Sequence, residues 1–179
     1  LDASGARPLG FTLTLALGAE GVAMGTRFMT TKESPLHETY KKLSIEKDVT
    51  DTLYSKRFDG IWCRVMKTDA AERAIKRGLN IPASFVNSKD IARQLNLPYF
   101  KVLAGVLASG FKNAIQMAYL ANAFRMIRLA TEEGDLQTGV LSAGQATGLI
   151  HDVPTVKEVV ERIVAEAKQV QQDLAQKLA

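Results

Sequence analysis

Two glycine-containing segments have residue types and spacing that suit ligand binding. In the first, Gly25 and Thr26 directly follow the short apolar run 22–24, which the sequence predicts to be a buried parallel strand. A glycine at the end of a strand lets backbone N–H groups approach an anion, because no Cβ stands in the way, and threonine adds a hydroxyl donor. The pattern indicates a phosphate-binding turn, and an ordinary strand-to-helix turn is the alternative.

The second segment is the glycine-rich loop 139–153, which contains Gly144, Gln145 and Gly148. A glutamine between glycines can reach a flat heterocycle with an amide group that both donates and accepts hydrogen bonds. An ordinary flexible loop has the same composition, and by itself this segment favours that simpler interpretation.

Other reactive side chains are few and scattered. His37 and His151 are the only histidines. They are far apart in the sequence and neither has a Cys/His cluster beside it, so no metal site is expected. Neither histidine has a recognisable nucleophile or orienting partner. Cys63 is the only cysteine, which excludes an internal disulfide and favours a reducing, cytoplasmic compartment. We expect Cys63 to be packed beside Trp62 rather than reactive.

The composition is that of an ordinary globular protein. Of 179 residues, 46% are hydrophobic and 23% are charged. The net charge of +4 is small and scattered, so we expect no nucleic-acid partner. The most apolar long stretch, 102–124, contains Lys112 and three side-chain amides, which excludes a membrane span of about 18 apolar residues. The chain starts at Leu1 with no signal-peptide pattern, and we expect this start to be an internal boundary.

Start and stop signals predict a mostly helical chain. Residues 10–19 predict a short helix that ends at Gly18, although a strand is almost as plausible there. Residues 52–66 predict two short strands or an extended loop. The other predicted helices run from Ser34-Pro35 to about Lys42, from Thr68 to Gly78, from Ser88 to before Pro98, over 99–131 with divisions at Gly105 and Gly110, and from a capping box at Thr155 and Glu158.

Taken together, the two glycine segments resemble one known family. Residues 16–28 (ALGAEGVAMGTRF) are similar to the eighth-strand signature of the nitronate monooxygenases, a signature that flavin-dependent enoyl-acyl-carrier-protein reductases share. Residues 143–150 (AGQATGLI) resemble the C-terminal glycine–glutamine motif of the same family. The resemblance covers residues 16 to about 168.

The resemblance implies an α/β fold, the C-terminal part of an FMN-binding (β/α)8 TIM barrel with a mostly helical second domain. Residues 1–30 would supply the last barrel elements, 31–138 the helical lid domain, and 139–179 the flavin-proximal loop and the terminal helix. Gly25 and Thr26 would bind the FMN phosphate, Met24 would be a further cofactor-binding residue, and Gln145 would lie near the flavin. The implied reaction is oxidation of an alkyl nitronate, a small-molecule substrate, by dioxygen.

This sequence also departs from the family pattern. The family has a Gly-Gly pair at the end of its seventh strand, whereas residues 1–9 contain only Ser4-Gly5. The family's usual catalytic histidine belongs to a region without a counterpart here, so neither His37 nor His151 inherits its role and the catalytic residues are unknown. We therefore expect an incomplete chain that is inactive on its own.

Two alternative functions fit the same sequence. A flavin-dependent enoyl-acyl-carrier-protein reductase would carry the same two motifs. A helical interaction module without catalysis is the alternative from another class, although such a module has no need for Met24-Gly25-Thr26.

The terminal helix carries a narrow apolar stripe that needs a partner. Its members recur at alternating four- and three-residue steps, as in a heptad seam: Val156, Val160, Ile163, Ala167, Val170 and Leu174. Exposing such side chains would cost roughly 1.5–3 kcal/mol each. We expect either residues 10–24 of the same chain or a second copy in a homodimer to cover the stripe.

Overall fold

The computed structural model describes residues 8–178, which form two compact units. One unit combines the two ends of the described chain, residues 8–51 and 143–178, and we call it the terminal unit. The other is the continuous segment 52–142, which we call the central unit. The predicted division at residues 30 and 138 differs from this one, because residues 31–51 lie in the terminal unit. The pair Ser4-Gly5 lies outside the described residues.

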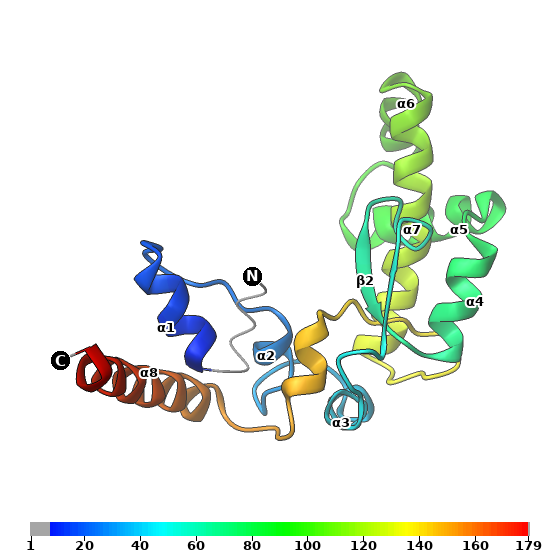
Figure 1. Cartoon of the computed structure of the whole chain (residues 1–179). Helices are drawn as coiled ribbons and strands as arrows, with labels where there is room; N and C mark the ends of the chain where they lie inside the picture. The colour runs from blue at the N-terminus through cyan, green and yellow to red at the C-terminus, as the bar shows by residue number, and fades with distance from the viewer. Residues whose placement is uncertain (1–7, 179) are drawn as a thin grey trace. The chain divides into compact units, whose positions relative to one another are not determined.

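The terminal unit is helical, and two of its helices come from opposite ends of the sequence. Its elements are α1 (Pro8–Ala16), α2 (Thr26–Met29), α3 (Glu38–Glu46), the 3-10 helix η1 (Gln145–Leu149) and α8 (Val156–Leu178). Helix α1 packs against α8, as Figure 1 shows in blue and red. The helix expected over residues 10–19 is confirmed, and Gly18 ends it with a φ of 93° that favours glycine.

The strand predicted at residues 22–24 is not formed. These residues have no regular secondary structure, and the half-buried Val22 and Met24 alternate with the exposed Ala23. A buried parallel strand needs neighbouring strands that accept and donate its backbone hydrogen bonds. Among the described residues, the named strands are an antiparallel pair in the central unit, so this segment keeps the alternation of a strand without the ladder.

Helix α3 starts three residues later than Ser34-Pro35 predicted. The ring nitrogen Nδ1 of His37 accepts a hydrogen bond from the Thr39 N–H and caps the helix. The Ser34 hydroxyl oxygen instead accepts from the Leu36 N–H in the preceding turn. A local side-chain-to-backbone bond of this kind competes with helix initiation, which explains the shift.

The central unit begins with two short strands, one of the two predicted alternatives, which pair as an antiparallel hairpin. Strand β1 (Thr52–Ser55) pairs with β2 (Cys63–Met66), with Thr52 opposite Met66 and Ser55 opposite Cys63. Its four helices are α4 (Asp69–Arg77), α5 (Ile81–Gln94), α6 (Tyr99–Ala108) and α7 (Phe111–Thr131).

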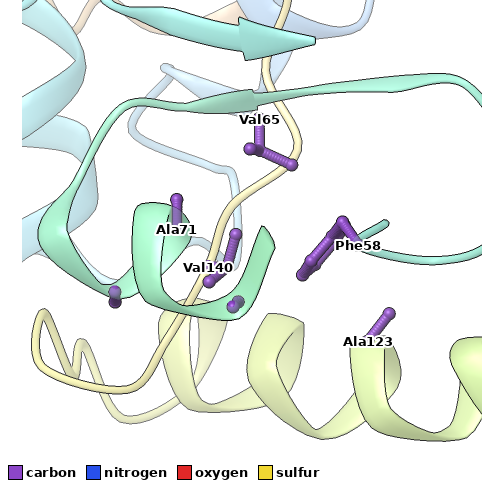
Figure 2. Packing of buried hydrophobic residues seen from close by; sticks show 7 residues of the cluster. Phe58, Val65, Ala71, Ala123 and Val140 are labelled. Carbon is purple, nitrogen blue, oxygen red and sulfur yellow. The ribbon is translucent and has the colours of Figure 1, made fainter. Parts of the chain in front are cut away.

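A small core joins the hairpin to the helices of the central unit. Figure 2 shows side chains from β2, α4, α7 and two connecting segments that meet in one place: Phe58, Val65, Ala71, Ala123 and Val140. Alanines supply the fully buried helical part of this core. All seven residues of the cluster are under 8% exposed.

Helix α4 confirms its predicted caps, whereas α5 corrects its predicted start. The Thr68 hydroxyl oxygen accepts from the Ala71 N–H, and Gly78 ends α4 with a φ of 67°. Helix α5 starts at Ile81 with Asn80 as its cap, seven residues before the expected Ser88. The Ser88 hydroxyl donates to the Phe85 carbonyl inside the helix, whereas a serine at an N-cap accepts a hydrogen bond from a backbone N–H.

Only one of the two expected glycine breaks divides the apolar stretch after Pro98. Gly110 separates α6 from α7 with a φ of 97°, a conformation that L side chains rarely adopt, whereas Gly105 lies inside α6. Helix α6 contains no buried residue although most of its side chains are apolar. Across residues 8–178, every helix is too short or too polar to cross a membrane.

The apolar stripe of α8 has a different register from the predicted one. Val159 and Ile163 are buried, and Ala167 and Val170 are half-buried, whereas Val156, Val160 and Leu174 are exposed. The stripe therefore starts at Val159 and uses the i, i+4, i+8 spacing of one face of a straight helix. Helix α1 of the same chain packs against α8, which was one of the two expected outcomes.

Two alanine substitutions on α8 test this register. Val159→Ala should lower the free energy of unfolding by about 1–3 kcal/mol, because it leaves a cavity in the packed face. Val160→Ala is the matched control, since it makes the same chemical change on a side chain that is 47% exposed. Urea unfolding followed by circular dichroism measures both, and equal effects would contradict the observed register.

Candidate functional site

The terminal unit brings the two glycine segments together. The Thr26 Oγ1 accepts a hydrogen bond from the backbone N–H of Gly144, with a distance of 3.0 Å between the two atoms. Helix α2, which starts at Thr26, also contacts η1, which starts at Gln145. Three of the four residues that the sequence singled out, namely Gly25, Thr26 and Gln145, therefore lie on two contacting turns of one unit.

Gly25 leaves open space directly before α2. It is exposed, and a Cβ built on it would meet no atom within 4 Å. Its φ of −87° and ψ of −71° are accessible to any residue, so the chain does not need glycine here for its own conformation. What a glycine provides at this position is access to the backbone, which is the property that binding an anion requires. Met24 precedes it and is half-buried.

The hydroxyl group of Thr26 keeps its own proton available. Its oxygen accepts from Gly144, and no acceptor for its O–H is found among residues 8–178. The half-buried Thr26 can therefore hold the second segment in place and still donate a hydrogen bond to a ligand.

Gln145 and Gly148 have different environments within η1. The Gln145 side chain is exposed and has no hydrogen-bond partner in the described part of the chain. Gly148 instead packs against the backbone after α3, where a Cβ would overlap the nitrogen of Val49 and the carbonyl carbon of Asp48. Gly148 is therefore required for close packing in this segment. The exposed Gln145 is the residue of the two that can contact a ligand.

A pair of arginines around Asp152 fixes the site to the terminal helix. The buried Arg27 of α2 has its Nη2 2.9 Å from Asp152 Oδ1, and Arg162 of α8 has its Nη1 2.8 Å from Asp152 Oδ2. Burial raises the pKa of Asp152, but the hydrogen bond from Arg162 and the charge of Arg27 outweigh it, so the pKa lies below its usual value. Asp152 therefore stays ionised at neutral pH.

Backbone contacts reinforce the same connection. The Lys32 N–H donates to the Pro154 carbonyl at 2.9 Å, and the Glu33 carboxylate accepts from the Val156 N–H at the start of α8. The predicted capping box is also present, because Thr155 and Glu158 exchange side-chain and backbone hydrogen bonds. The sequence analysis missed Arg27, Glu33 and Asp152, since no local spacing relates residues more than a hundred positions apart.

Neither the histidines nor the cysteine takes part in these contacts. His37 caps α3, and His151 is exposed. In the central unit, burial, with smaller contributions from the charge and hydrogen bond of Asp59, raises the pKa of Cys63 to about 12, so the thiol is protonated and a poor nucleophile at neutral pH. No group of three or more potential metal ligands occurs within residues 8–178.

Comparisons with known proteins give one consistent relationship. The model of the family described as nitronate monooxygenase matches residues 9–166. The chain is 32% identical over 163 residues to (3aS,4S,5R,7aS)-5-hydroxy-7a-methyl-1-oxo-octahydro-1H-indene-4-carboxyl-CoA dehydrogenase of Rhodococcus jostii (strain RHA1). The matched region covers 88% of this chain and 46% of that protein. A probable nitronate monooxygenase of Staphylococcus haemolyticus (strain JCSC1435) is 34% identical over 73 residues, 41% of this chain and 20% of that protein.

Solved structures show the same partial coverage. FabK from Thermotoga maritima matches 97% of this chain and 45% of its own chain, with a TM-score of 0.63 and 27% identity. The enoyl reductase domain of MlnA from the macrolactin biosynthesis cluster of Bacillus amyloliquefaciens matches 97% and 48%, with a TM-score of 0.68 and 15% identity, which supports the fold alone. The chain is thus a mostly helical α/β chain that spans less than half the length of these relatives.

Substitution of Gly148 should disrupt the packing of η1. Gly148→Ala places a Cβ on the backbone of Asp48 and Val49, and we expect a loss of about 2–4 kcal/mol in the free energy of unfolding. Gly21→Ala is the matched control, because a Cβ at Gly21 meets nothing within 4 Å. Urea unfolding of both variants measures the difference, and an unaltered Gly148→Ala protein would contradict the close approach.

The Asp152 ion pairs should make stability depend on pH. Asp152→Asn should lower the free energy of unfolding by about 1–3 kcal/mol at neutral pH, because Arg27 then stays buried without its anionic partner. A lowered folded pKa contributes stability above the unfolded value of about 3.9, and this stability is lost as the pH falls through the folded pKa. Unfolding curves of wild type and variant should therefore differ at pH 7 and converge in acid; a constant difference would contradict this assignment.

Proposed function

This chain belongs to the nitronate monooxygenase family of oxidoreductases, and we propose that it forms the C-terminal part of an FMN-dependent enzyme, an FMN-binding (β/α)8 barrel with a mostly helical second domain. In this proposal Gly25 and Thr26 bind the FMN phosphate, Met24 is a further cofactor-binding residue, and Gln145 faces the flavin. This chain matches about half the length of the relatives with solved structures, which supports its assignment to one part of a larger enzyme.

The hydrogen bond between Thr26 and Gly144 is the observation that carries the proposal. It joins the segment that resembles a phosphate-binding turn to the segment that resembles a flavin-proximal motif. A flavin mononucleotide has a phosphate at one end and a flat ring system at the other, so a site for it needs an anion-binding turn and a polar side chain on neighbouring segments.

The residues present fit such a group chemically. Gly25 has open space where a Cβ would stand, and the Thr26 hydroxyl keeps a proton to donate. The amide of Gln145 can donate to or accept from the polar edge of a flavin ring. Arg27 of α2 forms an ion pair with Asp152, so the carboxylate of Asp152 already balances its positive charge. When bound, FMN would supply the electron transfer, and these residues would bind and orient it.

Oxidation of an alkyl nitronate by dioxygen is the first candidate reaction. It is the chemistry of the family for which the matching model is described, and the Staphylococcus haemolyticus relative carries the same name.

Oxidation or reduction of an acyl thioester is the second candidate reaction. The relative that covers 88% of this chain is a dehydrogenase of a carboxyl-CoA compound, whereas the probable nitronate monooxygenase covers 41%. FabK from Thermotoga maritima is similar over 97% of this chain at 27% identity. The wider coverage by these relatives favours a thioester substrate as the competitor to a nitronate.

A substitution at Gly25 tests the phosphate site. Gly25→Val should weaken FMN binding by roughly tenfold or more, since the branched Cβ would occupy the space that a phosphate needs and remove at least one charge-assisted hydrogen bond. Fluorescence titration of FMN into the full-length enzyme that this proposal implies measures the affinity. Gly21→Val is the matched control, because both positions are open and neither has a positive φ.

Thermal unfolding should show that both variants are folded. Equal FMN affinity of the Gly25→Val and Gly21→Val proteins would refute the assignment of Gly25. The substrate class is decided in the same enzyme under anaerobic conditions. Ethyl nitronate should bleach the flavin if the first candidate is right. If the second is right, a saturated acyl-CoA should bleach the oxidised flavin, or an enoyl-CoA should restore the colour of the flavin after reduction with dithionite.

A further inference from the structure

A cavity of about 260 Å³ lies within the central unit, between α4, the start of α5, α7 and the segment that follows α7. None of its lining residues is among the four candidate flavin contacts. It exceeds the space of a single water, about 30 Å³, several times, so it can hold more than an inorganic ion.

Three arginines from two helices line this cavity. Arg73 and Arg77 are four residues apart on α4, which places them on the same side of that helix, and Arg125 comes from α7. No aspartate or glutamate is among the described lining residues. All three side chains are exposed, so they can turn toward an anion bound in the cavity, and each guanidinium group presents a fork of N–H donors to it.

None of the three arginines forms an ion pair within residues 8–178. An Nη of Arg73 donates to the Gln137 carbonyl, and Arg125 Nη1 lies 3.4 Å from the Asn87 Oδ1, so both contact neutral groups. Arg77 has no hydrogen bond or ion pair within the described chain. The charge of the cavity is therefore not neutralised by the residues that form it.

The nearby carboxylate of Asp135 is already engaged. It accepts hydrogen bonds from the backbone N–H groups of Gln137 and Thr138 and from the Thr138 hydroxyl. The hydrogen bond from the Thr138 hydroxyl is the largest cause of a pKa below the usual value for Asp135. Asp135 thus orders the turn that presents Gln137 and Thr138 to the cavity.

Buried amides hold the cavity wall in place and provide further donors. Asn87 and Asn122 are 5% and 9% exposed, and the Asn87 Nδ2 donates to the Asn122 Oδ1 at 2.9 Å. The Asn122 Nδ2 donates to the Asn80 carbonyl at 2.9 Å. Each amide nitrogen carries a second N–H for which the described residues supply no acceptor. Buried N–H groups without acceptors suit a ligand that brings oxygen atoms.

The rest of the wall is apolar. Ala70, Ala74, Ala83, Met126 and Leu129 contribute hydrocarbon surface and no side-chain donor or acceptor. A ligand that fills the cavity therefore needs an uncharged, mostly apolar part next to its anionic group.

We propose that this cavity binds a small organic oxyanion, a phosphate ester or a carboxylate, whose charged group contacts Arg73, Arg77 and Arg125 and whose apolar part lies against the alanines of α4. The guanidinium fork matches both kinds of oxyanion with two parallel hydrogen bonds. Neither the family relationship nor the FMN site enters this argument.

Calorimetric titration with phenyl phosphate and with benzoate tests the proposal and separates the two oxyanions. Saturable binding of either compound is expected, and inorganic phosphate should bind more weakly because it lacks the apolar part. Arg77→Gln should weaken binding of the compound that binds by roughly tenfold or more, since a charge-assisted hydrogen bond is lost. It should leave the thermal midpoint unchanged, because Arg77 has no partner within the described chain.

Lys76→Gln is the matched control, because it removes one positive charge from the adjacent position of α4, and Lys76 does not line the cavity. Binding should survive this change, and it should also survive Gly25→Val, which separates this site from the FMN proposal. Absence of saturable binding by both organic anions, or equal losses in the Arg77→Gln and Lys76→Gln proteins, would overturn the proposal.

Discussion

The terminal unit depends on joining two chain segments that are more than a hundred residues apart. The hydrogen bond from the Gly144 N–H to Thr26 spans 118 positions, and the contact between Arg27 and Asp152 spans 125. Closing so long a loop has an entropic cost that grows only slowly with its length. A few well-placed polar contacts and the packing of α1 on α8 can therefore hold the unit together.

Glycines in this chain serve packing as well as access, and their neighbours distinguish the two roles. Gly148 has backbone atoms of Asp48 and Val49 where a side chain would be, whereas Gly25 has open space. The first glycine lets η1 approach the end of α3, and the second leaves backbone accessible to a ligand. Gly148 thus contributes to stability, and Gly25 leaves space for binding.

The central unit keeps its core small and its surface chemically varied. Alanines of α4 and α7 pack with Phe58, Val65 and Val140 around the hairpin. Outside this core, the three arginines around the cavity have no carboxylate partner among the described residues. Positive charges gathered around one pocket without carboxylate partners favour an anionic ligand there.

Local signals in the sequence determined much of the secondary structure. Thr68 and Gly78 bounded α4, Gly110 divided the apolar stretch, and the capping box at Thr155 and Glu158 started α8. These predictions succeeded because caps and positive-φ turns involve residues within a few positions of one another. Where two local signals competed, as at Ser34 against His37 and Ser88 against Asn80, the sequence alone chose the wrong one.

Long-range relationships were decided by the tertiary structure. The run at 22–24 has the composition of a strand, but without a neighbouring strand it cannot form a ladder. The register of α8 followed from where α1 packs, since Val156, Val159, Val160 and Ile163 offer two apolar stripes of similar composition. The sequence marked Gly25, Thr26 and Gln145 as candidates, and the fold brought their segments into contact, because hydrogen bonds between distant residues leave no spacing in the sequence.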